Sequence, residues 1–232
     1  MNQITTNKII LALDTSDLNF AIDIAKKIKN KIFTIKLGLE FFNAHGKNGI
    51  KKFNDLGFNN IMLDLKLNDI GNTCFKAIKS LNGINFEYLT IHALGGKKMI
   101  LKCKEAANEI NQNIKILAVT ILTSLDDEDI GLMGIKNNIN DLVVKLAKNS
   151  SDAHGYVCSG NEALALRKII GKDKIIFCPG IRMPQDNKND QQRVMSPKQA
   201  LNNGADKIIM GRSLLLHGDI NENIEKVINS LN

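Results

Sequence analysis

Residues 60–73, NIMLDLKLNDIGNT, carry three charged side chains of alternating sign, Asp64, Lys66 and Asp69. The apolar run before them predicts a buried strand. Because side chains alternate between the two faces of a strand, Asp64 and Lys66 should share one face. An ammonium beside a carboxylate can stabilise a charge that develops during a reaction and can deliver a proton to it. Ion pairs also serve the fold alone, so this motif by itself leaves both interpretations open.

A second lysine, Lys36, interrupts the otherwise apolar run TIKLG. A buried lysine without a counter-charge tends to lose its proton, so Lys36 requires a carboxylate beside it. Asp14 ends the preceding predicted strand and Asp64 lies on the following one. These two carboxylates are therefore the expected partners of Lys36.

Eight short apolar runs alternate with amphipathic segments along the chain. Strict alternation predicts a parallel sheet, and eight repeats predict an α/β fold closed into a single (β/α)8 TIM barrel. An open doubly wound sheet is the alternative, but no Gly-x-Gly-x-x-Gly follows the first strand, which argues against a dinucleotide site. The predicted strands are 9–14, 32–38, 60–66, 88–92, 114–121, 153–158, 174–178 and 206–210. The predicted helices are 16–29, 39–56, 72–82, 96–111, 137–149, 160–170, 196–203 and 212–230.

Two arginines follow the last two predicted strands, Arg182 after the seventh and Arg212 after the eighth. In such a barrel the active site lies at the carboxyl ends of the strands, and phosphate commonly binds the loops after strands seven and eight. A guanidinium donates two parallel hydrogen bonds to phosphate, and the amide of Gly211 can approach an oxygen closely. We therefore expect a phosphorylated ligand.

The longest irregular segment is 179–195, between the seventh predicted strand and the next helix. Connections of this length without internal structure are typically binding loops or lids. Gly180 and Pro184 bracket a polar tip, so the segment is expected to close over the phosphate.

A chain of 232 residues fits one large domain or two small ones, and because α/β barrels commonly reach this length as one unit, we expect a single soluble domain spanning residues 1–232. The chain is 44% hydrophobic and 24% charged, which is ordinary for a globular protein. Its net charge of +7 comes from lysines spread over predicted helix surfaces, without a nucleic-acid motif. The composition therefore argues against nucleic-acid binding, while the positive potential favours a small anionic substrate.

Cysteine spacing and terminal composition predict a cytoplasmic protein. The four cysteines form no Cys-x-x-Cys pair and are expected to be reduced. The first eight residues are polar rather than signal-like, and no apolar run approaches the roughly 20 residues that span a membrane.

The histidines and serines offer little further chemistry. The four histidines show no metal-ligand spacing, so no metal is expected. His92, which ends the fourth predicted strand, is expected to be a hydrogen-bonded core histidine. Ser124 lies outside any nucleophile-elbow sequence, which argues against a nucleophilic serine.

Several motifs follow one another in a specific order and spacing: LALD with Asp14, IKLG with Lys36, LDLKLNDIGNT, ILTS, PGIR and the final MGR. Over essentially the whole chain, this set resembles the bacterial orotidine 5′-phosphate decarboxylase family. The Asp-x-Lys-x-x-Asp motif alone is shared with related sugar-phosphate barrels, whereas the full set is specific.

The resemblance implies decarboxylation of orotidine 5′-phosphate to uridine 5′-phosphate and carbon dioxide, without a cofactor, as the last step of de novo UMP biosynthesis. It implies a catalytic array of Lys36, Asp64, Lys66 and Asp69, in which Lys66 protonates the carbon that loses its carboxylate. It also implies a homodimer in which Asp69 and Thr73 reach into the neighbouring subunit's site.

Substrate contacts are likewise implied by the resemblance. Asp14 and Lys36 would hold the ribose hydroxyls, and Thr123 and Ser124 would border the pyrimidine. The phosphate would be surrounded by Arg182, Gln191, Gly211 and Arg212. Gln192 is adjacent to Gln191 and remains the alternative to it.

Two other functions stay open at this point. One is a magnesium-dependent barrel acting on a keto-sugar phosphate, in which the second strand is expected to carry an acidic metal ligand where this chain has Lys36. The other is a catalytically silent phosphate-binding barrel, which the intact Asp64, Lys66 and Asp69 argue against.

Overall fold

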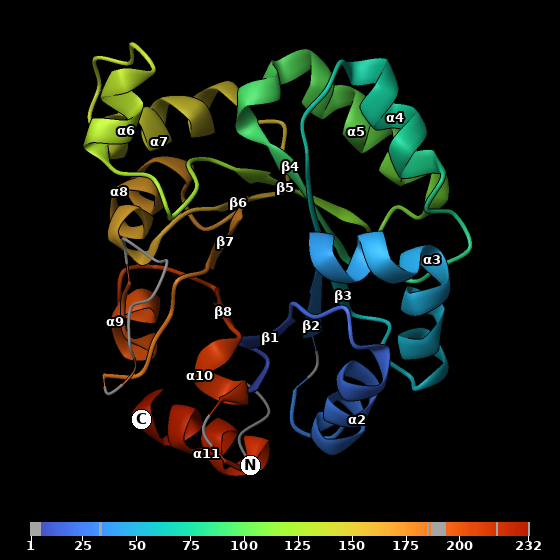
Figure 1. Ribbon diagram of the computed structural model, residues 1–232. Helices are drawn as coiled ribbons and strands as arrows, with labels where there is room; N and C mark the ends of the chain where they lie inside the picture. The colour runs from blue at the N-terminus through green and yellow to red at the C-terminus, as the bar shows by residue number, and fades with distance from the viewer. Residues whose placement is uncertain (1–5, 33, 185, 187–193, 217, 232) are drawn as a thin grey trace.

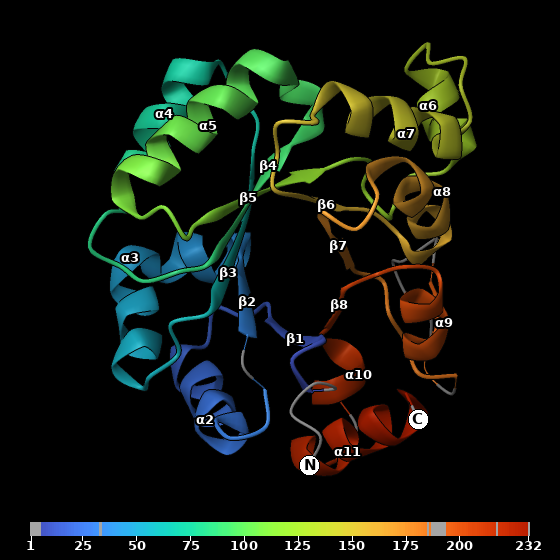
Figure 2. The ribbon, with the colours of Figure 1, turned by 180° about the vertical axis from the view of Figure 1, so that it is seen from behind.

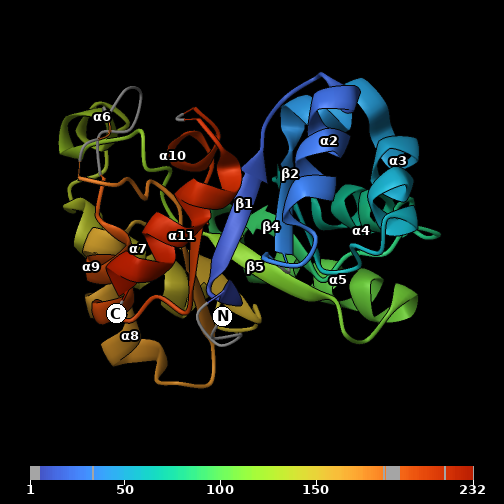
Figure 3. The ribbon, with the colours of Figure 1, turned by 90° about the horizontal axis from the view of Figure 1, so that it is seen from below.

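The computed structural model describes residues 6–32, 34–184, 186, 194–216 and 218–231. Parallel strands β1 to β8 form a closed barrel in sequence order, and β1 pairs with β8 to complete it. The helices surround the ring of strands (Figures 1 and 2). Figure 3 shows β1 between α2 and α3 on one side and α10 and α11 on the other. The predicted TIM barrel of the α/β class is therefore confirmed.

Each strand begins and ends within two residues of its predicted bounds. The strands are β1 (Ile9–Leu13), β2 (Thr34–Gly38), β3 (Ile61–Leu67), β4 (Tyr88–His92), β5 (Lys115–Val119), β6 (Gly155–Val157), β7 (Ile175–Cys178) and β8 (Lys207–Met210). The helices are α2 (Leu18–Ile28), α3 (Leu39–Asp55), α4 (Gly71–Lys79), α5 (Gly96–Ile110), α6 (Asp127–Leu132), α7 (Ile139–Asn149), α8 (Gly160–Ile170), α9 (Pro197–Asn202), α10 (Arg212–Leu215) and α11 (Ile220–Leu231), with a 3₁₀ turn η1 (Ala93–Gly95).

The helices differ from the prediction in detail, and α3, expected as one helix over 39–56, is kinked at Gly46, whose φ is +52°. The single helix expected over 212–230 is divided into α10 and α11, and Gly218 between them has a φ of +74°, which an α-helix cannot accommodate. Helix α6 was not expected, because its six residues are too few to show a helical period. A capping box holds it instead, in which Asp126 accepts from the amide of Asp129 and the Asp129 carboxylate accepts from the amide of Asp126.

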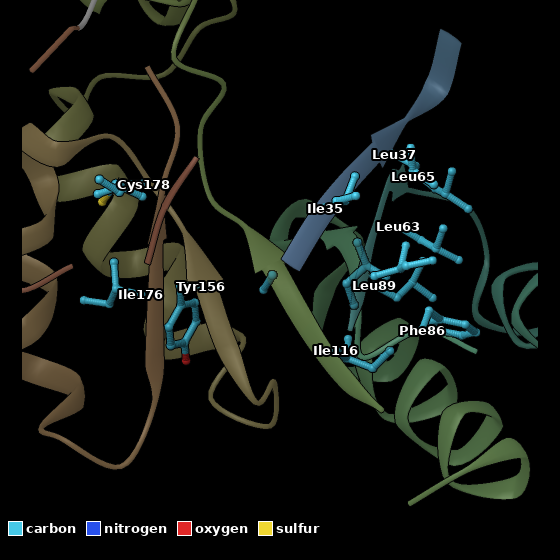
Figure 4. Packing of buried hydrophobic residues seen from close by; sticks show 14 of the residues in the cluster. Ile35, Leu37, Leu63, Leu65, Phe86, Leu89, Ile116, Tyr156, Ile176 and Cys178 are labelled. Carbon is cyan, nitrogen blue, oxygen red and sulfur yellow. The ribbon is translucent and has the colours of Figure 1, made fainter. Parts of the chain in front are cut away.

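The alternation of side chains along the strands divides the apolar core in two. Outward-facing residues such as Ile35, Leu63 and Leu89 pack beneath the helices (Figure 4). Inward-facing residues fill the barrel: Ile10, Ala12, Met62, Tyr88, Leu117, Val119, Val157, Phe177 and Ile209. Two residues beyond Ala12 and Met62, the inward positions become Asp14 and Asp64. The apolar interior of the barrel is therefore followed by charged groups at the carboxyl ends of the strands.

Among the helices that the structure describes, none combines the length and the apolar character needed to span a membrane.

Candidate active site

A cavity of about 520 Å³ opens at the carboxyl ends of the strands. Sites for small molecules typically enclose roughly 300–1,000 Å³. Polar groups from β2, β3 and the residue that follows β1 line one part of it, and the loops after β5, β7 and β8 contribute to the rest. Most of the predicted site residues border this one cavity: Asp14, Lys36, Asp64, Lys66, Thr123, Ser124, Arg182, Gly211 and Arg212.

Four of these side chains form a continuous series of ion pairs of alternating sign across β1, β2 and β3. Lys36 Nζ donates to Asp14 Oδ1 at 2.7 Å and to Asp14 Oδ2 at 3.0 Å. The same ammonium lies 3.2 Å from Asp64 Oδ2, to which Lys66 Nζ donates at 2.8 Å. The expected pairing of Lys36 with Asp14 and Asp64 is thus confirmed, as is the shared face of Asp64 and Lys66.

The two central groups of this series are buried yet held in their charged forms. Burial by itself would lower the pKa of Lys36, but the carboxylates of Asp64 and Asp14 outweigh it and raise that pKa above its usual value. Burial would raise the pKa of Asp64, but the ammonium groups of Lys36 and Lys66, with hydrogen bonds from Lys66 and Thr90, lower it to about 2. The site therefore presents fixed charges at neutral pH.

Gly38, the last residue of β2, leaves room for the first ion pair. A Cβ atom at this position would lie 2.6 Å from Asp14 Oδ1 and 3.3 Å from Lys36 Nζ. Any larger residue would push the carboxylate away from the ammonium. The glycine of the IKLG motif thus leaves the space in which these two charges approach each other.

The backbone of Lys66 is strained. Its φ of +47° is the only positive value at a non-glycine residue in the part of the chain that the structure describes. Such conformations cost on the order of 1–3 kcal/mol and gather at functional sites, where the surrounding structure enforces them. Lys66 lines the cavity beside Asp64, so the strained residue is part of the candidate site.

The prediction that His92 is a hydrogen-bonded core histidine was wrong. The residue is only partly buried, and its Nδ1 atom is shielded from solvent without a hydrogen-bond partner among the described residues. Burial lowers the pKa of His92, the Lys66 ammonium lowers it further, and Asp64 opposes both. The charges of Lys66 and Asp64 therefore both act on the His92 ring.

Thr90, two residues earlier on β4, was missed by the sequence reasoning. It is fully buried, and its hydroxyl donates to Asp64 Oδ1 at 2.9 Å. The alternation that places Tyr88 inside the barrel places Thr90 and His92 on the same face. A polar residue at an inward position of a buried strand was the signal that could have identified it.

Asp69 and Thr73 are not among the residues that line the cavity. Both are exposed, and Asp69 Oδ1 accepts a hydrogen bond of 2.7 Å from the amide of Ile70. Within the described residues, Asp69 forms no ion pair with Lys66. Among the described residues, Lys66 therefore pairs with one carboxylate, that of Asp64, and not with the predicted second one, Asp69.

The predicted phosphate side of the cavity is only partly within the described residues. Arg182 is buried, and its Nη1 atom donates to Ile181 O at 3.0 Å. The base of the 179–195 segment is paired, because the Arg182 amide donates to Met195 O at 3.0 Å and the Met195 amide donates to Gly180 O at 3.2 Å. Gln191 and its alternative Gln192 lie outside the described residues.

At the end of β8, the chain passes close to β1. A Cβ atom on Gly211 would lie 3.3 Å from Ala12 O, and Arg212 then begins α10. Both residues border the same cavity as Arg182. No group of three or more histidine, cysteine, aspartate or glutamate side chains in the described part of the chain is arranged to hold a metal ion.

Comparison with known proteins assigns this arrangement to a family. The family model described as "Orotidine 5'-phosphate decarboxylase / HUMPS family" matches residues 7–227. The chain belongs to this family. The orotidine 5′-phosphate decarboxylase resemblance read from the motifs is therefore confirmed.

Individual members of the family match over nearly their full length. An orotidine 5′-phosphate decarboxylase of Ehrlichia canis is 40% identical over 228 residues, covering 97% of this chain and 98% of the relative. One from a Wolbachia of Culex pipiens is 41% identical, with 97% and 99% covered. The crystal structure of the Lactobacillus acidophilus enzyme superposes with a TM-score of 0.83 at 31% identity, covering 97% and 99% of the two chains.

Proposed function

We propose that this protein decarboxylates orotidine 5′-phosphate to uridine 5′-phosphate and carbon dioxide without a cofactor, in UMP biosynthesis. The observation that carries the proposal is the carboxylate of Asp64, held between the ammonium groups of Lys36 and Lys66 at 3.2 Å and 2.8 Å. This array borders a cavity that Arg182 and Arg212 also line. A fixed positive charge and a phosphate site in one cavity are what this reaction requires.

The chemistry follows from the charge that appears when the carbon–carbon bond breaks. Carbon dioxide leaves, and the electron pair stays on a ring carbon that delocalises it poorly. The Lys66 ammonium stabilises that pair, and because Asp64 orients it beforehand, little reorganisation is needed. Lys66 then donates a proton to the carbon as general acid and regains one from water.

The rest of the cavity suits the other parts of the substrate. Asp14 and Lys36 would accept and donate hydrogen bonds with the ribose hydroxyls, and Thr123 and Ser124 would border the pyrimidine. Closure of the 179–195 segment over the phosphate would convert remote binding energy into assembly of the charged site.

Arg212→Ala should raise KM and lower kcat/KM by at least ~10-fold, because a charge-assisted hydrogen bond is worth roughly 1.5–3 kcal/mol. Steady-state kinetics on orotidine 5′-phosphate measure both constants. Lys168→Ala, on the outer helix α8, is the control and should leave them unchanged. Wild-type kinetics in Arg212→Ala would mean that the phosphate binds elsewhere.

We further propose that two subunits complete each other's sites. Asp69 is exposed in the single chain, and its neighbour Ile70 is 72% exposed. Leu94, at 58% exposure, lies in the η1 turn whose Gly95 is adjacent to Asn68. Apolar side chains around an exposed carboxylate are a surface that a second copy would cover, bringing Asp69 and Thr73 to the partner's cavity.

All four cysteines are free, as suits a cytoplasmic enzyme.

A turnover assay with and without chelator separates this function from the magnesium-dependent keto-sugar phosphate reaction. The decrease in ultraviolet absorbance of orotidine 5′-phosphate should proceed equally in both conditions. Loss of activity with chelator would favour the magnesium-dependent reaction. Tight binding of uridine 5′-phosphate without any turnover would indicate a silent phosphate-binding barrel.

A further inference from the structure

Strand β3 departs from regular pairing with β4 at the residues that carry the charges of the site. Along β3 the paired positions advance from Leu63 to Leu67, while along β4 they advance only from Leu89 to Ile91. Lys66 lies in this irregular stretch, where its positive φ turns the backbone out of the ladder. Its amide therefore needs an acceptor other than a strand carbonyl.

The hydroxyl of Thr90 is that acceptor. The Lys66 amide donates to Thr90 Oγ1 at 2.9 Å, and Thr90 Oγ1 donates to Asp64 Oδ1 at 2.9 Å. An amide can only donate and an ionised carboxylate can only accept, so the single hydroxyl proton must point to Asp64. One oxygen atom thus joins the strained backbone to the carboxylate.

We propose that Thr90 is a positioning residue for the decarboxylation, and that its hydroxyl sets the place of the Lys66 ammonium through the Lys66 backbone and the Asp64 carboxylate. The proposal rests on the proposed function, which gives Lys66 its chemical role. Thr90 is fully buried and does not line the cavity, so it acts through these two neighbours and does not touch the substrate.

The contacts of Asp64 explain why a hydroxyl is needed. Its Oδ2 atom faces both ammonium groups, Lys66 at 2.8 Å and Lys36 at 3.2 Å, while Oδ1 receives the hydrogen bond from Thr90. Without that donor, Oδ1 would be buried and unsatisfied, and the carboxylate could rotate away from Lys66. Valine has the shape of threonine but neither donates nor accepts, whereas serine does both.

Three variants test the proposal by kinetics. Thr90→Val should lower kcat by about 10²-fold, the loss that a displacement of about 1 Å can cause, with KM within about threefold of wild type. Thr90→Ser should restore most of kcat. The control is Thr120→Val, at another fully buried threonine, whose hydroxyl donates to a backbone oxygen, Val157 O, at 3.0 Å. It should retain kcat.

The pH profile supplies a readout that a general loss of packing would not move. The hydrogen bond from Thr90 is one of the interactions that lower the pKa of Asp64. Removing this hydrogen bond raises the pKa of Asp64. In Thr90→Val, the acidic limb of the pH profile of kcat should therefore move to higher pH. Thr120→Val should keep the wild-type profile.

Hydrogen exchange of the Lys66 amide tests the same contact without substrate. The amide should be protected in the wild type and in Thr90→Ser, and should exchange faster in Thr90→Val. Thr90→Cys, with a weak hydrogen-bonding group of similar size, replaces the valine variant if that variant does not fold.

The outcomes separate this proposal from the proposed function. Wild-type kcat and a protected Lys66 amide in Thr90→Val would overturn the role of Thr90. So would an equal loss of kcat in Thr90→Val and Thr120→Val, or a loss in Thr90→Ser as large as in the valine variant. If the exchange pattern is as expected but the wild-type protein does not consume orotidine 5′-phosphate, the function fails and the positioning of Lys66 by Thr90 stands.

Discussion

Lys66→Ala should lower kcat for orotidine 5′-phosphate by at least ~10³-fold, so that nearly all turnover is lost. Removing one preorganised charge costs roughly 10²–10³-fold, and removing a general acid costs roughly 10²–10⁴-fold. Both losses fall on the chemical step, because in the proposed mechanism Lys66 supplies the charge and the proton. Single-turnover and steady-state kinetics measure the effect.

The fold should survive this substitution. Asp64 keeps Lys36 at 3.2 Å and the hydroxyl of Thr90 at 2.9 Å, so its charge is not left unpaired. The control is Lys26→Ala, which removes an exposed lysine of α2 that lies 3.8 Å from Asp23. Exposed ion pairs contribute little, so this control should match the wild type in activity and melting temperature. A Lys66→Ala enzyme with full activity would remove Lys66 from the mechanism.

Mixing two inactive variants should restore about a quarter of the wild-type activity. Lys66→Ala lacks the ammonium, and Asp69→Asn lacks the carboxylate that is proposed to come from the partner. With random exchange, about half of the dimers contain one subunit of each kind, and each of these has one intact site of two. The measurement is kcat per subunit before and after joint refolding, with native mass spectrometry to count the mixed dimers.

The choice of Asp69→Asn isolates the charge from the local fold. An asparagine oxygen can still accept the hydrogen bond that Asp69 Oδ1 receives from the Ile70 amide at 2.7 Å. The variant alone should therefore fold normally and lose activity. If mixed dimers form without any recovery of activity, the sites are not shared in the proposed way. If Asp69→Asn alone is fully active, Asp69 has no role in the reaction.

Much of the site could be predicted from local sequence. The alternation of apolar runs and amphipathic segments gave the order and bounds of the strands, since each strand is short and nearly all apolar. Polar residues at strand ends, such as Asp14 and Lys36, then had to meet at one end of the barrel. Their pairing followed from the cost of burying an unpaired charge.

The rest depended on information that one strand does not contain. The displaced pairing of β3 and β4, and with it the positive φ of Lys66, is set by how two strands meet. The LTIH pattern could place Thr90 on the inward face, but not show that its hydroxyl accepts from the displaced Lys66 amide. Asp69 is exposed in the single chain, so its proposed contact with a second subunit could not be read from local sequence. Helix α6 depends on a capping box within one turn, which periodicity does not detect.

A structure of the protein with uridine 5′-phosphate bound would show which atom of the ring Lys66 faces. We expect Lys66 Nζ within about 3.5 Å of the ring carbon that carried the carboxylate, with the phosphate at Arg182, Gly211 and Arg212. A ring placed so that Lys66 faces any other atom, or a phosphate bound away from both arginines, would contradict this expectation.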